Sequence, residues 1–490
     1  MSEEEIIALR RHKLERLRSR GIDPYPVRVQ RTHSAKAAVD LIAASADSHE
    51  VVTVAGRVTA FRRMGKAAFL DLRDGSGRIQ AYFKQERIGV EPYEMLLHDI
   101  DLGDFLGVTG TLFHTKSGEP TIEAQTFTLL TKALRPPPEK WHGLQDVEIR
   151  YRQRYLDLIA NPEVRDTFVA RSRVIREIRR FMDARGFLEV ETPILQSSAG
   201  GAAARPFTTY HNALDRQQYL RIALELHLKR LVVGGFDKVY EIGRIFRNEG
   251  VSTKYNPEFT MLESYEAYAD YTNVMAMVEE MVSAVAEEVL ATRRVPYGET
   301  EIDFSPPWPR VPLREAIRES CSVDFDAHRD ARSLAKAAAA AGVAVEESWG
   351  RGKIIDELLT AHVEPHLMQP TFLTDYPVEL SPLAKRKPDS PHLVERFELF
   401  MAGREVANAY SELNDPVDQR ERLLEQAQLR AAGDDEAELA DEDFLVALEH
   451  GLPPTAGLGI GIDRLVMALT GHASIREVIL FPALREKGEG

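Results

Sequence analysis

The sequence predicts an α+β chain of two or three domains, the first of which is a small β-barrel. Three observations lead to this prediction. The chain has 490 residues, more than one hydrophobic core usually holds. Short alternating apolar runs fill residues 51–130, whereas helical patterns mixed with strands follow from residue 150. Between these regions lies the proline-rich stretch 136–140, which is typical of a stiff linker.

Five short strands are expected in the first region, separated by glycine-rich turns such as residues 74–77. This spacing favours a barrel of the oligonucleotide-binding (OB) type. Such barrels stack bases on aromatic side chains beside a basic groove, for which Arg62, Arg63, Lys66 and Phe69 are candidates. Phe69 taken alone fits a buried core position better. The expected strands are Val51–Val58, Ala67–Leu72, Arg78–Phe83, Phe105–Leu112 and Thr121–Leu129.

Composition excludes several classes of protein. Cys321 is the single cysteine and the 14 histidines form no cluster, so a disulfide framework and a Cys or His metal site are not expected. The N-terminus has no secretory h-region and no apolar run is long enough to cross a bilayer. We therefore expect a cytoplasmic protein without a membrane partner.

The formal net charge of −15 argues against a protein that coats DNA, because such binding depends on phosphate neutralisation. A local basic patch remains compatible with a nucleic-acid partner. One candidate patch lies on an expected helix over residues 1–20, and a solvated helix face explains it equally well. Its members are Arg10, Arg11, Lys13, Arg16, Arg18 and Arg20.

An arginine at the end of an apolar strand is the most informative feature of the second region. The alternating run Val239–Phe246 predicts a strand, which is followed by Arg247-Asn248-Glu249-Gly250. Arg247 and Glu249 are two residues apart, so we expect both to project from one face. A rigidly held arginine beside a carboxylate suits a phosphate or acyl-phosphate ligand, although a surface salt bridge would give the same four residues.

Carboxylates recur at alternate positions of other expected strands. Glu263 and Tyr265 share one face of the run 259–265, and a second run, 405–412, carries Asn408, Tyr410 and Glu412 on one face. Each glutamate alone is better explained as a salt bridge at the rim. Together with Glu225 they predict a cationic ligand, because buried carboxylates need compensating charge.

Two further motifs complete the pattern. Glu398 and Glu405 flank a predicted hairpin turn and could hold Mg²⁺ together with substrate phosphates, although two exposed acids would look the same. The glycine-rich run Gly457–Gly461 precedes Arg464 and is expected to open an apolar helix at which a backbone approaches a ligand. It fits neither a Rossmann fingerprint nor a P-loop.

With these motifs in order, the chain resembles the class II lysyl-tRNA synthetases along nearly its whole length. The three class II motifs correspond to residues 171–193, to residues 246–259 around Arg247, and to residues 459–464. Two further stretches, 405–416 and 200–206, look specific to the lysine enzymes. The resemblance implies an N-terminal helical extension (1–48), an OB-fold anticodon-binding domain (49–135), a linker (136–150) and a catalytic domain (151–490) with an antiparallel sheet of six or seven strands flanked by helices.

The implied reaction is ATP-dependent ligation of L-lysine to tRNA(Lys) through lysyl-adenylate, in a homodimer whose interface includes residues 171–193. The resemblance implies that Arg247 and Arg464 neutralise phosphate charge and that Glu249 and Phe259 hold adenine. Tyr255 would lie in the loop that faces ATP. Mg²⁺ would lie on Glu398 and Glu405. Lysine would be held at Gly201, Glu225, Glu263, Tyr265, Asn408, Tyr410 and Glu412, and the anticodon at Arg62, Phe69 and Gln80.

The chain departs from the family pattern at two positions. Leu224 stands where the family commonly has proline, and Tyr255 where it commonly has histidine. Both departures put the rate in question more than the identity. The alternatives are an aspartyl- or asparaginyl-tRNA synthetase, which would need a cation in its side-chain pocket, a paralogue that lysylates a protein, which would lack the barrel, and a catalytically silent RNA-binding module.

Overall fold

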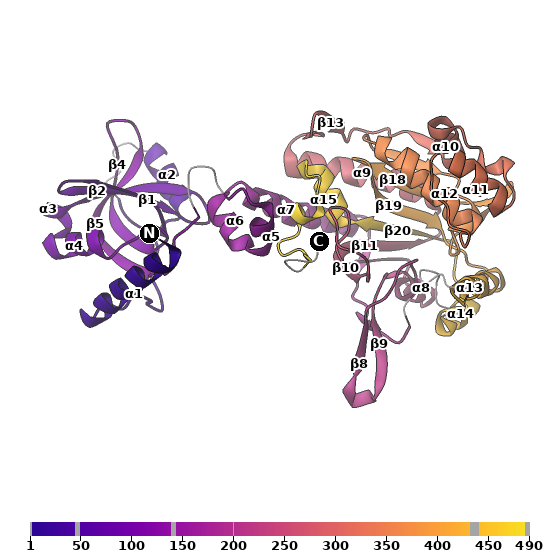
Figure 1. The fold of residues 1–490 in the computed structure, drawn as a ribbon, viewed down its shortest axis with the longest axis horizontal. Coiled ribbons are helices and arrows are strands. Elements are labelled where there is room, and N and C mark those ends of the chain that lie inside the picture. Colours follow the sequence, from indigo (N-terminus) through magenta and orange to yellow (C-terminus); the bar gives the residue numbers. More distant parts are fainter. Residues whose placement is uncertain (1, 45–49, 139–143, 199, 432–440, 486–490) are drawn as a thin grey trace. The chain divides into compact units, whose positions relative to one another are not determined.

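The computed structural model describes residues 2–44, 50–138, 144–198, 200–431 and 441–485. The chain divides into two units, residues 1–145 and residues 146–490 (Figure 1). Part of the predicted linker (139–143) lies outside the described residues. So do residues 434–440 of the acidic stretch 434–443, for which the sequence favours a solvated face. No described helix is long and apolar enough to cross a membrane.

The first unit is built on a closed five-stranded barrel with the strand order β1-β2-β3-β5-β4. Alternate residues of each strand point into a core of aliphatic side chains, as the period of two in the sequence predicts. All five expected strands are present. Their bounds are β1 Val51–Met64, β2 Ala67–Arg73, β3 Arg78–Lys84, β4 Phe105–His114 and β5 Pro120–Thr131, with helices α1 Glu3–Ser19, α2 Ala35–Ala44, α3 Gln85–Ile88 and α4 Val90–His98.

Most of the basic cluster on α1 pairs within the first unit. Arg10 is 6% exposed and donates to the backbone oxygens of residues 102, 133 and 135. Lys13 pairs with Asp101, and both Arg16 and Arg20 pair with Asp99. Four of the six predicted patch residues therefore attach α1 to the barrel rather than to a partner.

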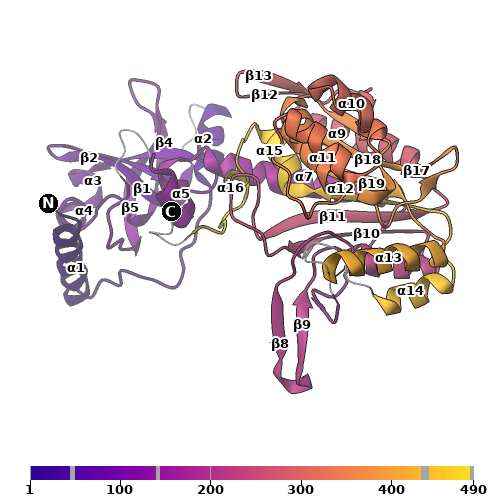
Figure 2. The ribbon, with the colours of Figure 1, turned by 45° about the vertical axis from the view of Figure 1, so that its right-hand side comes forward.

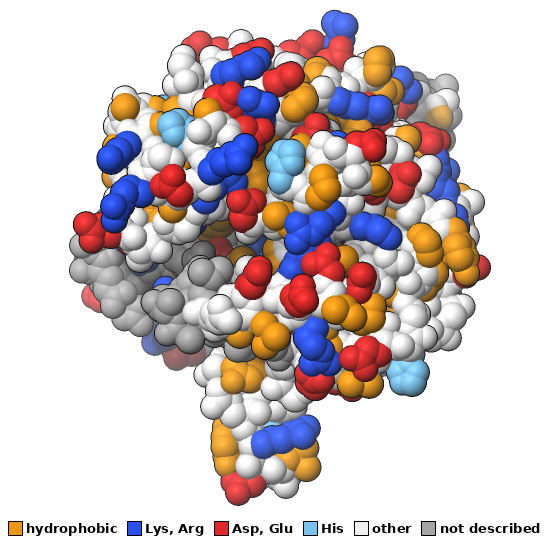
Figure 3. Space-filling model, turned by 90° about the vertical axis from the view of Figure 1, so that its right-hand side faces the viewer, with side chains coloured by type: hydrophobic (Ala, Val, Ile, Leu, Met, Phe, Trp, Pro, Cys, Tyr) orange, Lys and Arg blue, Asp and Glu red, His pale blue; other side chains and the backbone are white. Residues whose placement is uncertain are grey.

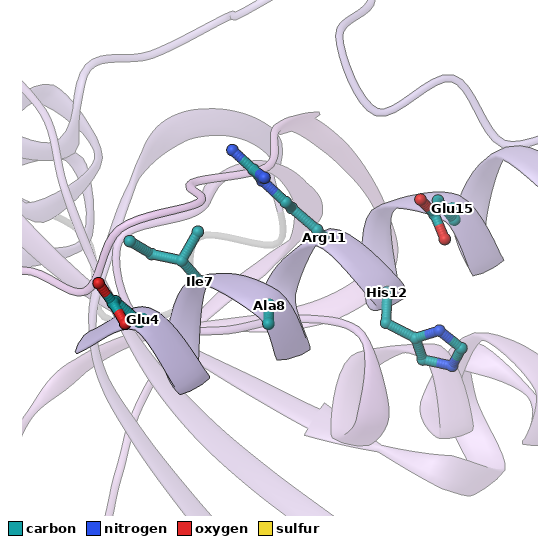
Figure 4. A pocket seen from close by; sticks show the side chains of 6 residues that line it. All are labelled: Glu4, Ile7, Ala8, Arg11, His12 and Glu15. Atoms are coloured by element: carbon teal, nitrogen blue, oxygen red, sulfur yellow. The ribbon is translucent and has the colours of Figure 1, made fainter. Parts of the chain in front are cut away.

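The outward side of α1 has a mixed character. A hollow on this helix is lined by both acidic and basic side chains. Arg11, Arg18 and Arg20 are the exposed members of the cluster. The lining residues are all from α1: Glu4, Ile7, Ala8, Arg11, His12 and Glu15 (Figure 4).

An eight-stranded sheet forms the centre of the second unit, with the order β14-β15-β18-β19-β20-β11-β10-β6. The expected sheet of six or seven antiparallel strands is wrong in two respects, because β6 and β14 extend it and pair in parallel with their neighbours. Strand β6 has only two residues. The bounds are β14 Arg310–Pro312, β15 Thr371–Thr374, β18 Arg396–Met401, β19 Arg404–Ser411, β20 Thr455–Gly461, β11 Glu258–Ala267, β10 Lys238–Phe246 and β6 Leu188–Glu189.

Helices cover both faces of this sheet (Figures 1 and 2). On one face α7 and α9 pack over an apolar core, to which α7 contributes the buried stripe Val174, Ile178 and Met182. On the other face α8 and α14 enclose a second core with Tyr265. The helices are α5 Val147–Arg152, α6 Arg154–Ala160, α7 Val164–Ala184, α8 Glu225–Val233, α9 Tyr271–Leu290, α13 Pro416–Ala431, α14 Glu442–Glu449, α15 Ile462–Thr470 and α16 Ile475–Val478.

Smaller elements surround the sheet. A third core lies among three helices that follow β14 in the chain. The hairpin β8–β9 extends away from the rest of the unit, and acidic and basic side chains are interspersed over the face shown in Figure 3. The bounds are α10 Leu313–Cys321, α11 Ala331–Ala340, α12 Arg351–Leu358, β7 Leu195–Gln196, β8 Thr208–His211, β9 Arg216–Leu220, β12 Arg294–Tyr297, β13 Thr300–Asp303, β16 Arg386–Lys387 and β17 Ser390–Val394.

Candidate active site

Three glycines of β20 clear the floor of a site on the central sheet. Gly457, Gly459 and Gly461 alternate along this strand, so they share one face. This corrects the expectation that they open a helix, because α15 begins only at Ile462. The residues directly opposite them on the two neighbouring strands are those predicted to bind a ligand. Gly459 lies between Glu263 and Asn408, and Gly457 lies between Tyr265 and Tyr410.

The space above Gly457 is already filled by site residues. A Cβ atom at this position would lie 2.0 Å from Oε1 of Glu412 and 2.7 Å from Cε1 of Tyr265. A side chain here would therefore displace the carboxylate of Glu412 from the floor. The glycine is required for close packing, not for an unusual backbone conformation.

A buried acidic pocket lies beside this floor. Glu225, at the first turn of α8, accepts a hydrogen bond of 2.7 Å from the hydroxyl of Tyr410. Lys229, one helical turn later and 0% exposed, donates to Oε1 of Glu225 at 2.5 Å and forms an ion pair with Glu412. Glu225, Tyr410 and Glu412, which are far apart in the sequence, are thus brought together as predicted.

Glu263 completes the pocket. Its Oε1 accepts from the backbone N–H of Leu224 at 2.9 Å and its Oε2 from the hydroxyl of Tyr265 at 3.1 Å. Burial, and next the charge of Glu225, raise the pKa of Glu263 to about 7. A proline at position 224 would have no N–H, so the departure at Leu224 provides Glu263 with a hydrogen bond.

Glu412 has charge without full compensation. Its side chain is buried. Among the described residues Oε1 has no hydrogen-bond partner, and Oε2 has only the ion pair with Lys229. Burial raises the pKa of Glu412 well above its usual value, while Lys229 acts in the opposite direction. A cationic ligand would supply a partner for Oε1, because a buried carboxylate oxygen without a partner costs folding free energy.

Gly201 lies against the same pocket. Its φ of +86° is in the region that favours glycine, and an added Cβ would be 3.2 Å from the Cβ atoms of Ala223 and Glu225. The backbone of residue 201 can therefore approach a ligand held by Glu225.

Arg247 lies immediately after the end of β10. The strand ends at Phe246, and the N–H of Glu249 donates to the carbonyl of Arg247 in a tight turn. The expectation that a strand projects both side chains from one face is therefore wrong. The guanidinium lies 5.2 Å from the ring centroid of Phe259. Burial lowers the pKa of Arg247, and the neighbouring carboxylates of Glu249 and Glu405 oppose this effect.

Arg464 faces the same region from α15. It donates to the backbone oxygen of Glu405 at 2.8 Å and to Oε2 of its carboxylate at 3.1 Å, and it lies 5.7 Å from the ring centroid of Tyr255. The start of α15 is anchored by the preceding Asp463, which pairs with Arg171 of α7 at 2.7 Å. These contacts fix Arg464 beside the loop that carries Tyr255.

The carboxylates of Glu398 and Glu405 flank the turn between β18 and β19. Both central residues of this turn, Ala402 and Gly403, have positive φ, as a tight hairpin requires. Burial raises the pKa of Glu398 to about 7, Arg396 lowers it, and the charge of Glu405 raises it further. Two like charges that disfavour each other in this way fit a divalent cation.

The environment of Glu398 also contains a positioning network. Oε2 accepts from the hydroxyl of Tyr376 at 2.8 Å and Oε1 from Arg396 at 2.5 Å. Arg396 donates in addition to Oδ1 of Asn408 at 3.0 Å. Asn408 is therefore linked to the pair of carboxylates as well as to the floor. The described residues contain no cluster of three or more potential metal ligands, so phosphate oxygens would have to complete a metal site.

The first unit has a separate candidate surface. Arg62, Phe69 and Gln80 line one hollow on neighbouring strands of the barrel, as predicted. The ring of Phe69 is stacked on Tyr82 with centroids 4.5 Å apart, and Tyr82 contacts Phe113 at 6.0 Å. Phe69 is therefore half-buried at the surface, not part of the barrel interior.

Comparisons with known proteins agree with this arrangement. A family model described as "tRNA synthetases class II (D, K and N)" matches residues 146–485. The chain belongs to this family of class II synthetases. A second model, described as "OB-fold nucleic acid binding domain", matches residues 52–130.

Full-length relatives carry a more specific name. A lysine–tRNA ligase from Moorella thermoacetica is 57% identical over 490 residues, covering 100% of this chain and 99% of that protein. Those from Pelotomaculum thermopropionicum and Bacillus subtilis are 56% and 52% identical, covering 99% and 98% of this chain and 95% and 97% of their own. The class II family and the OB fold, both expected from the motifs, are thereby confirmed.

Several residues of the site were not found from the sequence. Lys229 could have been recognised by its spacing of four from Glu225, which places both on one helix face. Arg396 and Tyr376 had no sequence signal, because their contacts with Glu398 depend on strand pairing and on a distant loop.

Proposed function

We propose that the chain ligates L-lysine to tRNA(Lys) through a lysyl-adenylate intermediate and releases AMP and pyrophosphate. The observation that carries the proposal is the acidic pocket, in which Oε1 of the buried Glu412 has no hydrogen-bond partner among the described residues and Oε2 has only the ion pair with Lys229. The ε-ammonium of lysine would supply the missing donor, with Glu263 and Tyr265 around it. Glu225 and the backbone of Gly201 would receive the α-ammonium, and Asn408 and Tyr410 would orient the substrate.

ATP would bind on the neighbouring part of the sheet. Glu249 and Phe259 would hold adenine, and Arg464 and Tyr255 would face the terminal phosphates. Glu398 and Glu405 would hold Mg²⁺, which supplies charge neutralisation of the phosphates when bound. The lysine carboxylate attacks the α-phosphorus, and Arg247 stabilises the negative charge that grows there. Positioning and electrostatics account for the rate, so no side chain has to act as a base.

The remaining proposals concern assembly. Arg62, Phe69 and Gln80 of the barrel domain (49–135) would read the anticodon, with the catalytic domain at 151–490. A homodimer is supported by exposed apolar side chains on α7 and in the segment that follows it: Val169, Leu188, Ile194 and Leu195. The cytosol is the compartment we propose, since tRNA and ATP are available there.

An aspartyl or asparaginyl specificity is less compatible with the pocket. Lys229 is already paired with Glu225 and Glu412, so an aspartate side chain would meet carboxylates. A charge pair at 4 Å is worth about 4 kcal/mol at an effective dielectric near 20, and the same magnitude opposes like charges.

The test is ATP–pyrophosphate exchange with lysine, aspartate, asparagine and β-lysine offered separately. Exchange with lysine alone supports the proposal. Exchange with aspartate or asparagine contradicts the pocket assignment. No exchange with any of them, while tRNA still binds, supports a silent RNA-binding module.

A further inference from the structure

The acidic pocket contains a cation of its own. Lys229 is fully buried on α8, and its ammonium group lies between the carboxylates of Glu225 and Glu412. The rings of Tyr410 and Phe444 lie 5.8 Å and 5.6 Å from Nζ. The two rings present apolar surface to the ammonium group, which is shielded from water.

The charges of the pocket do not cancel. Glu225, Glu263 and Glu412 provide three carboxylates, against which Lys229 provides one positive charge. Up to two negative charges are left in excess. Lysine brings two ammonium groups, one at the α-carbon and one at the end of the side chain, which would balance this excess. The carboxylate of the substrate would pair with Arg247 and so adds no negative charge to the pocket.

We propose that Lys229 is a positioning residue for lysine recognition, which balances one of the three buried carboxylates and keeps Glu225 and Glu412 ionised for the two ammonium groups of a diamino acid. The inference rests on the proposed function and assigns a role to a residue outside the predicted contacts. Two observations support it: the direct contacts of Nζ with both carboxylates, and the lack of any other donor to the oxygens of Glu412 among the described residues.

Without Lys229, Glu412 would be a buried carboxylate with no cation beside it. Burial already raises the pKa of Glu412, and the charge of Lys229 is the first opposing effect. Removing that charge raises the pKa of Glu412 further, so the pocket takes up a proton more readily. The other titratable groups that face it are Glu225 on α8, Glu263 and Tyr265 on β11, and Tyr410 on β19.

The experiment compares the lysine KM of Lys229→Met, Glu412→Gln and the double variant in ATP–pyrophosphate exchange between pH 6.5 and 8.5. For Lys229→Met we expect the lysine KM to rise roughly 10- to 100-fold at neutral pH, as for a lost hydrogen bond to a charged group. The KM should fall again as the pH rises, since deprotonation restores the carboxylates, while kcat and the KM for ATP stay near their wild-type values.

The double variant tests the coupling between the two residues. Because Glu412 is one of the two carboxylates through which Lys229 acts, Lys229→Met should raise the KM of Glu412→Gln by a smaller factor than it raises the wild-type KM. This comparison also replaces the single variant if Lys229→Met fails to fold, because only Glu225, which keeps its hydrogen bond from Tyr410, then loses its cation. Lys238→Met is the matched control, since Lys238 pairs with Glu266 at the surface of β10.

The outcomes separate this inference from the proposed function. Lysine-dependent exchange by the wild-type protein tests the proposed function alone. Exchange only with another amino acid overturns the proposed function and the role of Lys229 together. With lysine-dependent exchange present, an unchanged KM in Lys229→Met, a KM increase that does not depend on pH, or a full additive effect in the double variant overturns the role of Lys229.

Discussion

Two buried lysines, one in each unit, differ in what surrounds them. Lys132 of the barrel unit donates to the backbone oxygen of Asp99 at 2.7 Å and to the carboxylates of Asp101 and Asp104 at 2.6 Å and 2.7 Å. Asp104 also accepts from two backbone N–H groups. Every charge in this cluster has partners, so the cluster stabilises the fold and leaves no capacity for a ligand.

Lys229 is equally buried but its surroundings are incomplete. It meets Glu225 and Glu412, yet Oε1 of Glu412 has no hydrogen-bond partner among the described residues and Glu263 adds a further carboxylate. The comparison teaches that burial of charge does not by itself mark a functional site. A functional site is indicated by an excess of buried charge of one sign that no group of the folded chain neutralises.

The largest effect is expected on stability in the barrel. Lys132→Met should lower the free energy of unfolding by about 3–5 kcal/mol, because it leaves the fully buried Asp104 without its cation, whereas Asp101 keeps Lys13. Denaturant unfolding measures this, and lysine-dependent exchange by the folded fraction should be unchanged. Lys84→Met, which breaks a surface pair with Glu123, is the control and should cost less than about 1 kcal/mol. Equal losses in both variants would contradict the comparison.

Arg247→Ala tests the catalytic side of the second unit. We expect exchange to fall by about 10²- to 10³-fold, since this residue would stabilise charge that develops on the α-phosphate. Thermal unfolding should stay close to wild type. Arg244→Ala is the matched control on the exposed side of β10. A similar loss of exchange in both variants would show that the region, not Arg247, is responsible.

Phe69→Ala tests whether the barrel surface has a ligand of its own. Loss of one stacking surface should weaken tRNA binding by about 1–3 kcal/mol, measured as the KM for tRNA in aminoacylation. ATP–pyrophosphate exchange, which needs no tRNA, should be unaffected. Val51→Ala, at an exposed position of the same barrel, should change neither value. An unchanged KM for tRNA in Phe69→Ala would remove Phe69 from the anticodon surface.

The smallest effect is a pH dependence of lysine binding. The pKa of Glu263 is raised to about 7 by burial, and a cationic substrate favours its ionised form. The lysine KM should therefore rise roughly tenfold as the pH falls from 8 to 6. Because the folded pKa lies above the ordinary value of 4.5, the ligand-free chain loses stability as the pH rises from 4.5 to about 7, and lysine should oppose this loss.

The control for this prediction removes the titrating group. Glu263→Gln should raise the lysine KM at every pH and make it nearly independent of pH in this range. A wild-type KM that stays flat between pH 6 and 8 would mean that Glu263 keeps the same protonation state throughout.

Local sequence patterns are sufficient to predict the five barrel strands and most members of the candidate site. These depend on local rules, namely the period of two in strands, the period of 3.6 in helices and the spacing of polar residues within one strand. Glu263 and Tyr265 share a face for this reason, and their hydroxyl–carboxylate contact follows.

Which charged side chains pair with one another follows from the tertiary structure and not from the local sequence. Four basic residues of α1 serve the barrel because the turn before β4 presents Asp99 and Asp101 and the barrel backbone offers carbonyl groups to them. Strand pairing brings Oε1 of Glu412 over Gly457, where it has no partner, and Oε2 beside Lys229. Compensation depends on distances of a few ångström between residues far apart in the chain, and local patterns contain no information on such distances.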